Sequence, residues 1–140
     1  MGRAKTICAM KSERLRELSE IYGLVGSDFH MQKYGHKEVP FMLKSGIDKI
    51  QAIEKMEVDF EPIEALCVPG EHVALKVKAK WGDNPIYQTI GEASKQNCRV
   101  SYLACMAEKR GRGRAILNLT GFANEGVFSK DDMWQEDEQQ

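Results

Sequence analysis

The sequence lacks the features that would direct it to a membrane. No apolar run approaches the roughly 18 residues that a spanning helix needs. Residues 1–12 carry Arg3, Lys5 and Lys11 around a short apolar patch at residues 7–10, which does not fit a signal peptide. We therefore expect a cytoplasmic protein that has no membrane contact.

Cysteine is sparse and poorly spaced for a disulfide framework or a zinc site. No two cysteines form a C-x-x-C pair, so free thiols are favoured over disulfides or metal ligands. The four cysteines are Cys8, Cys67, Cys98 and Cys105.

Motifs for catalysis are also missing. The chain contains no G-x-x-x-x-G-K-[ST] loop and no G-x-G-x-x-G after a strand. One set of potential ligands, Asp28, His30 and His36, has a spacing that fits no standard metal site. Asp59, Glu61 and Lys76 form only a loose nuclease pattern. We expect no catalytic residues, no cofactor and no enzyme activity, and keep a metal-dependent nuclease as the least favoured alternative.

What is present is the composition of one globular domain with an uneven charge. The 140 residues are 42% hydrophobic and 29% charged. A chain of this length and composition can bury a hydrophobic core without disulfide bonds or a structural metal ion. Residues 129–140 hold one lysine against five carboxylates, whereas residues 1–128 hold 19 basic and 16 acidic side chains. We expect a single domain at residues 1–128 and a mobile acidic tail at residues 129–140, with a protein partner for the tail as a further hypothesis.

The apolar periodicity indicates an α+β fold. Apolar residues at helical spacing predict helices at residues 12–24, with Ser12 as N-cap, 41–56 and 100–120. Alternation and turn residues predict strands at residues 58–68, 72–81 and 86–91. Residues 26–40 have no clear period, which favours a loop or a short strand. We expect a three-stranded antiparallel meander packed against the long C-terminal helix and the N-terminal helices.

A row of lysines is the clearest candidate for binding. Lys76, Lys78 and Lys80 alternate with apolar residues, so their amines leave one face of a strand, roughly 7 Å apart. This spacing is close to that of phosphates along an extended nucleic-acid strand. The alternative is a solvated outer face whose lysines discourage aggregation.

The long helix carries a second basic cluster. Arg110 and Arg114 lie four residues apart and share a helix face with an apolar stripe, which suits phosphate forks or buried carboxylate pairs. Lys109 adds a third cation. Gly111 and Gly113 each cost roughly 1 kcal/mol relative to alanine inside a helix. This cost predicts a close approach by another element, a subunit or a ligand at one of them at least.

Two further groups complete the candidate DNA-binding residues. Lys95 and Asn97 precede the long helix, where backbone N–H groups favour anions, although Asn97 also suits a plain N-cap. Trp81 and Tyr87 flank the second turn and are candidates for base stacking, with core packing as the alternative.

Four segments together resemble a known family. They read FMLKSGIDKIQA at residues 41–52, YQTIGEASKQN at 87–97, YLACMAEKRGRGRAILNLTGF at 102–122 and GVFSKDD at 126–132. Over residues 34–132 the chain resembles the phage-type single-strand annealing proteins, the Erf-like and RecT-like superfamily, whose shared core is a β-β-β-α unit.

The resemblance implies binding and annealing of single-stranded DNA in phage recombination and DNA repair, without nucleotide hydrolysis, by a homo-oligomeric ring or filament. It places DNA in a groove between the sheet and the long helix. The implied basic contacts are Lys76, Lys78, Lys80, Lys109, Arg110 and Arg114. An edge strand at residues 58–68 would extend the sheet between protomers. The alternative is an oligomeric interaction protein that binds no nucleic acid.

Overall fold

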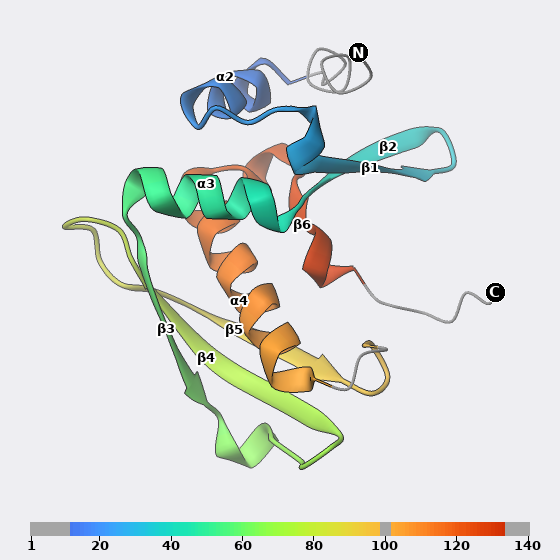
Figure 1. Cartoon of the computed structure of the whole chain (residues 1–140), viewed down its shortest axis with the longest axis vertical. Coiled ribbons are helices and arrows are strands. Elements are labelled where there is room, and N and C mark those ends of the chain that lie inside the picture. Colours follow the sequence, from blue (N-terminus) through green and yellow to red (C-terminus); the bar gives the residue numbers. More distant parts are fainter. Residues whose placement is uncertain (1–11, 99–101, 134–140) are drawn as a thin grey trace.

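The computed structural model describes residues 12–98 and 102–133, which form an α+β fold (Figure 1). The helices in these ranges are α2 (Glu13–Ile21), α3 (Lys44–Glu54) and α4 (Leu103–Thr120). The strands are β1 (Phe29–Tyr34), β2 (Lys37–Met42), β3 (Glu57–Pro62), β4 (His72–Lys80), β5 (Tyr87–Ser94) and β6 (Phe128–Ser129). None of these helices is long and apolar enough to cross a bilayer.

The predicted meander is confirmed. Strands β3, β4 and β5 form an antiparallel sheet in chain order, here called the meander sheet. Glu57 of β3 lies opposite Lys80, and Ala79 of β4 lies opposite Tyr87. Turns before and after β4 are built on Gly70 and Gly82, whose positive φ values of 73° and 58° suit glycine. Alternation in β4 then places one row of side chains toward α4 and the other toward solvent.

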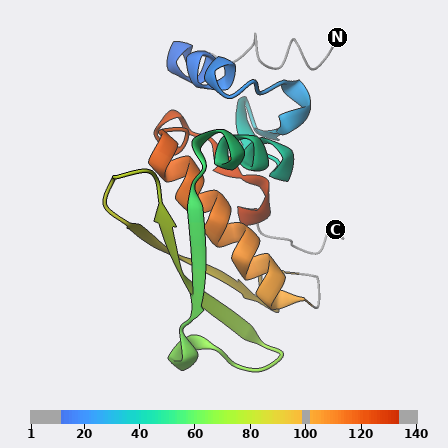
Figure 2. The same cartoon turned by 60° about the vertical axis from the view of Figure 1, so that its left-hand side comes forward.

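The long helix packs directly onto one face of the meander sheet, and the other face is uncovered (Figures 1 and 2). A Cβ built on Gly91 of β5 would come 2.3 Å from the Ala107 carbonyl oxygen and 2.7 Å from the Gly111 Cα. A Cβ on Gly111 would come 2.4 Å from Val77 Cγ2. The absence of side chains at both glycines is therefore what lets helix and strand approach this closely.

The second helix glycine faces another part of the same chain. A Cβ on Gly113 would come 2.7 Å from the Ser129 hydroxyl oxygen in β6. The prediction of a close approach at one of the glycines is confirmed, and in both cases the neighbour belongs to this chain. The glycines therefore give no support to a subunit contact through this helix.

A second sheet, which the sequence did not predict, occupies much of residues 26–40. Strands β1 and β2 form a hairpin in which Phe29 lies opposite Met42, and β2 pairs in parallel with the short β6. Because Phe41 and Met42 belong to β2, helix α3 begins at Lys44 instead of residue 41. The hairpin extends away from the body of the molecule (Figure 1).

A buried carboxylate anchors the base of this hairpin. The Asp28 side chain accepts hydrogen bonds from Ser45 Oγ at 2.7 Å, Lys49 Nζ at 2.8 Å and the Val25 N–H at 2.9 Å. Burial alone would raise the pKa of Asp28, but these hydrogen bonds and the Lys49 charge hold it below its usual value. Asp28 is therefore ionised and fixes the start of β1 against α3.

Hydrophobic cores pack against both halves of α4. One joins α2, α3 and the C-terminal half of α4 around Ile50, Ile116 and Phe122. Another fills the space between the meander sheet and the N-terminal half of α4, around Leu75 and Met106. Ser12 accepts a hydrogen bond from the Leu15 N–H and caps α2, as predicted.

Several predicted boundaries need correction. The predicted strand at residues 58–68 ends at Pro62, which lacks an N–H, and is followed by a 3₁₀ turn (Glu64–Leu66). Strand β5 extends to Ser94, and residues 100–101 of the predicted long helix lie outside the described residues.

The predicted boundary after residue 128 falls inside the fold. Ser129 is 2% exposed within β6, and a further 3₁₀ turn (Lys130–Asp132) lies against α4. The predicted tail therefore begins too early, because its first residues pair with β2 and bind α4. Residues 134–140 lie outside the described residues.

Candidate nucleic-acid interface

The lysine row lies on the uncovered face of the meander sheet. Val77 and Ala79, which alternate with the lysines, pack toward α4, so Lys76, Lys78 and Lys80 point the opposite way. The register places Glu61, Asp59 and Glu57 of β3 directly opposite these lysines, in that order. A row of carboxylates therefore runs beside the row of amines.

The amines are only partly neutralised by these carboxylates. Lys78 Nζ lies 3.8 Å from the nearer Glu61 carboxylate oxygen, and both side chains are exposed. Lys80 Nζ donates to the Asn84 carbonyl at 2.7 Å. In the described part of the chain, Lys76 has no ion-pair partner within 4 Å. Since β3 is acidic, the positive potential of the row is higher on its β5 side.

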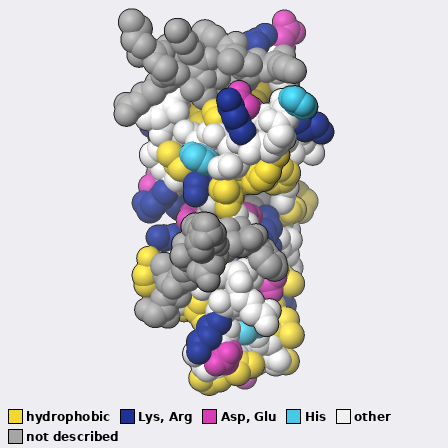
Figure 3. Space-filling model, turned by 90° about the vertical axis from the view of Figure 1, so that its right-hand side faces the viewer, with side chains coloured by type: hydrophobic (Ala, Val, Ile, Leu, Met, Phe, Trp, Pro, Cys, Tyr) yellow, Lys and Arg dark blue, Asp and Glu magenta, His cyan; other side chains and the backbone are white. Residues whose placement is uncertain are grey.

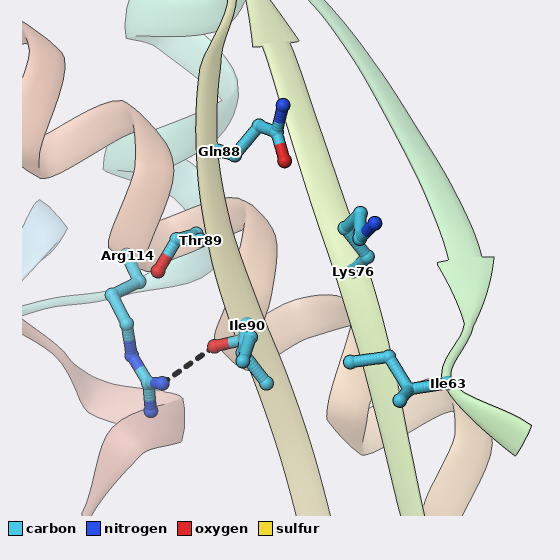
Figure 4. A pocket seen from close by; sticks show the side chains of 6 residues that line it. All are labelled: Ile63, Lys76, Gln88, Thr89, Ile90 and Arg114. Atoms are coloured by element: carbon cyan, nitrogen blue, oxygen red, sulfur yellow. Dashed lines mark hydrogen bonds between the residues drawn. The ribbon is translucent and has the colours of Figure 1, made fainter. Parts of the chain in front are cut away.

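Lys76 shares a hollow with Arg114 of α4 (Figure 4). The Arg114 side chain crosses the outer edge of β5, where Nη1 donates to the Ile90 carbonyl at 2.6 Å. This hollow, of about 420 Å³, brings together two predicted cations from different elements. Its described lining is Ile63, Lys76, Gln88, Thr89, Ile90 and Arg114.

An acidic side chain from the C-terminal turn holds the Arg114 guanidinium. Nη2 lies 2.6 Å from Asp132 Oδ1, and Nε lies 3.2 Å from Oδ2, which is a two-pronged ion pair. The hydrogen bond to Asp132 raises the pKa of Arg114, against the lowering by burial. The same pair occupies the donors that a phosphate would use, so Asp132 is a built-in competitor at this position.

Arg110 has a structural role. It is 3% exposed, and its Nε donates to the Asp131 carbonyl at 2.6 Å. Nη1 donates to the Glu92 carbonyl and to Asn97 Oδ1, and Nη2 donates to the Asn97 carbonyl, all within 3.0 Å. Four internal hydrogen bonds use most of the five guanidinium N–H groups. Arg110 therefore fastens β5, the following loop and the C-terminal turn to α4.

The loop before α4 differs from the predicted anion site. Asn97 Oδ1 also accepts from the Ser94 N–H at 3.0 Å, so Asn97 closes the loop, whereas the N-cap of α4 is Tyr102. Lys95 Nζ lies 3.3 Å from a Glu71 carboxylate oxygen. The adjoining hollow is lined by Glu71 and Glu92 as well as by Lys95 and His72, so its carboxylates offset the charge that would attract an anion.

The two aromatic candidates are half-buried. Trp81 packs against the core that joins α2, α3 and the C-terminal half of α4, and its Nε1 donates to Glu54 at 3.4 Å. The Tyr87 hydroxyl accepts from Asn118 Nδ2 at 2.9 Å, and its ring packs beside Val77 and its neighbours. Both side chains serve the fold, and neither stands free on the lysine face.

The groove implied by the resemblance is closed. At Gly91 and Gly111 the backbones of β5 and α4 are in contact, and the lysine row lies on the other face of the sheet. Lys109 is a half-buried residue of α4 and does not line the hollow with Lys76. The structure therefore brings together Lys76, Lys78 and Lys80, with Arg114 at one side, and leaves Lys95 and Lys109 apart.

Positive side chains are dispersed on the side of the molecule seen in Figure 3. There the coloured Lys and Arg side chains are interspersed with acidic and apolar ones. Sequence reasoning missed four members of the hollow: Ile63, Gln88, Thr89 and Ile90. The period-2 pattern of β5 could have indicated Gln88 and Ile90, because both occupy outer-face positions opposite the lysines.

The described residues offer little support for disulfide or metal chemistry. Cys67 and Cys105 are free thiols, as predicted, Cys98 is buried, and Cys8 lies outside the described part of the chain. Among residues 12–98 and 102–133, no three His, Cys, Asp or Glu side chains are grouped closely enough to hold a metal ion.

Comparison with known proteins adds no identification. No protein-family model, curated protein or solved structure matches this chain.

Proposed function

We propose that this protein binds single-stranded DNA across β4 and β5 of the meander sheet and promotes annealing of complementary strands. The observation that carries the proposal is the shared hollow of Lys76 and Arg114, two cations from different elements beside an uncovered sheet face. Sequence resemblance to annealing proteins and the β-β-β-α order support the same conclusion.

The mechanism is electrostatic. Lys76, Lys78 and Lys80 contact successive phosphates at a spacing of roughly 7 Å. Arg114 contacts one more at the β5 edge, where the phosphate takes the place of the Asp132 carboxylate on its guanidinium. Ile63 and Ile90 offer apolar contact to sugar or base faces inside the hollow. Carboxylates on β3 repel phosphates, so the strand runs on the β5 side of the lysines.

Annealing follows from partial neutralisation. Two complementary strands repel each other through their phosphates, and a bound protein that neutralises phosphates on one strand lowers this repulsion while base edges stay free. The step breaks no covalent bond and uses no nucleotide. Assembly of several copies would align a longer strand, so a ring or filament belongs to the proposal.

The test is binding of a fluorescein-labelled single-stranded oligonucleotide, measured by anisotropy at two salt concentrations. Four phosphate contacts predict a roughly 50-fold loss of affinity between about 50 and 200 mM salt. Complementary strands should pair faster with protein present, without metal or nucleotide. Absence of binding at low salt would reject the proposal, and metal-dependent cleavage lost on changing Asp59 would favour a nuclease.

The second candidate is an interaction protein that binds no nucleic acid. Three carboxylates of β3 lie directly opposite the three lysines, and this arrangement also suits a solvated, self-compensated surface. The anisotropy experiment separates the two candidates, because this alternative predicts no salt-dependent binding.

A further inference from the structure

The two edges of the meander sheet are finished in different ways. On the β5 edge, side chains bond the outward backbone groups. Arg114 bonds the Ile90 carbonyl, Arg110 bonds the Glu92 carbonyl, and Asn97 accepts from the Ser94 N–H. These contacts block the addition of a further strand at β5.

The β3 edge is open. The Ile63 N–H donates to the Ala74 carbonyl at 2.9 Å, which fixes the side of β3 that bonds β4. Because the direction of backbone groups alternates along an antiparallel strand, the N–H and C=O of Val58 and Phe60 point away from the sheet. Within the described residues these outward groups have no hydrogen-bond partner. No helix or strand lies beyond β3 in Figure 1.

The side chains along this edge define what it would accept. Glu57, Asp59 and Glu61 are exposed on the outer face, and Glu64 follows in the 3₁₀ turn. Among described residues, Glu57 and Asp59 have no ion-pair partner within 4 Å, and Glu61 has only the 3.8 Å contact with Lys78. The edge therefore carries a stripe of three carboxylates that the lysines of β4 neutralise only in part.

On the inner face the same edge is apolar. Val58 and Phe60 are half-buried against Val77, Ala79 and Ala115, with part of each side chain still accessible. An added strand would cover these side chains with its own inward row. Pro62 has no N–H, so backbone pairing is confined to the part of β3 before it.

We propose that the outer edge of β3 binds an extended segment of a partner protein in which Lys or Arg alternates with small apolar residues. Its basic row lies beside Glu57, Asp59 and Glu61, and its apolar row covers Val58 and Phe60. A β3 strand from a second copy fits poorly, because two rows of carboxylates would then face each other.

The experiment uses the full chain and a labelled, end-blocked seven-residue peptide that alternates lysine and valine. We expect saturable binding that weakens with salt, and no binding of the matched glutamate–valine peptide. Amide hydrogen exchange at Val58 and Phe60 should slow when the peptide binds. This readout reports strand addition directly and does not depend on any variant folding.

Three variants sharpen the test. The affinity for the lysine–valine peptide should fall about tenfold in the edge variant, because three cross-strand charge pairs are lost. This variant combines Glu57→Gln, Asp59→Asn and Glu61→Gln. The matched control, Glu17→Gln, Glu20→Gln and Glu38→Gln, removes the same charge from exposed sites elsewhere and should bind normally. Val58→Pro removes an outward N–H without breaking a β3–β4 bond, and should abolish binding.

Three results would overturn the proposal. One is equal weakening in the edge variant and its control. Another is unchanged exchange at Val58 and Phe60 with peptide bound. The third is self-association of the protein that Val58→Pro abolishes, because it would identify a second copy as the occupant.

Discussion

Replacing Gly91 by alanine should be among the most damaging conservative changes in the chain. The added Cβ would meet the Ala107 carbonyl oxygen at 2.3 Å and the Gly111 Cα and N at 2.7 Å. These are backbone atoms of α4, so no side chain can rotate away to make room. The helix must lift from the sheet, which loosens the packing of its own Met106 and of Val77 in β4 beneath it.

The expected loss of stability at Gly91 can be compared with the losses for alanine at the two glycines of α4. Overpacking a core costs about 1–3 kcal/mol, and with only backbone to displace we expect about 3 kcal/mol at Gly91. At Gly111 the obstacle is a Val77 methyl group at 2.4 Å. Because alanine also restores about 1 kcal/mol of helix propensity, the net loss there should be about 1–2 kcal/mol. At Gly113 the obstacles are the Ser129 hydroxyl oxygen at 2.7 Å and its Cβ at 2.8 Å. The Cβ moves only with the short strand β6, and alanine again restores helix propensity, so we expect a net loss of about 1 kcal/mol.

The measurement is the free energy of unfolding in urea, followed by far-ultraviolet circular dichroism for the three single variants. The expected order of destabilisation is Gly91→Ala, then Gly111→Ala, then Gly113→Ala. Stability of Gly91→Ala within about 1 kcal/mol of the parent would refute the reasoning. A larger loss at Gly113 than at Gly91 would also contradict it.

Three further predictions concern charge. Asp132→Asn should bind single-stranded DNA about two- to five-fold tighter than the parent, because it frees the Arg114 guanidinium from its ion pair. Asp131→Asn removes the same charge and should change the affinity measured by anisotropy less. If the remaining acidic tail competes for the same cations, removing residues 134–140 should tighten DNA binding several-fold at low salt, and the difference in affinity from the parent should shrink as salt rises. Equal affinities at low salt would exclude this competition. The folded pKa of Asp28 lies below its unfolded value of about 3.9, so its stabilisation is present above that pH and is lost as pH falls through the folded pKa; urea midpoints should therefore fall less with acid in Asp28→Asn than in the parent.

The meander was predictable because its signals are local. Val73, Leu75, Val77 and Ala79 alternate with polar residues between two turns that contain Gly70 and Gly82, and the structure follows this pattern. The β1–β2 hairpin was missed because Pro40 and a polar tip obscure its period. Its parallel partner β6 is two residues long and far along the chain, and such a pairing has no local signature.

The candidate site was predictable in part. Alternation placed Lys76, Lys78 and Lys80 on one face, but the carboxylates opposite them depend on the register between β3 and β4. Helical spacing grouped Arg110 with Arg114 and left open whether they bind phosphates or internal groups. Burial resolves this for Arg110, which bonds carbonyls and Asn97. The partner of Arg114, Asp132, had been assigned to the tail.

The salt dependence of single-stranded DNA binding tests the central claim most directly. The variant Lys76→Ser, Lys78→Ser and Lys80→Ser should bind more weakly, and the slope of log affinity against log salt should fall by about two units, because three phosphate contacts are removed. The control Lys33→Ser, Lys37→Ser and Lys55→Ser removes the same charge from exposed positions in the β1–β2 hairpin and at the end of α3, and should keep the parent slope. Equal slopes in the two variants would contradict the claim that DNA follows the lysine row.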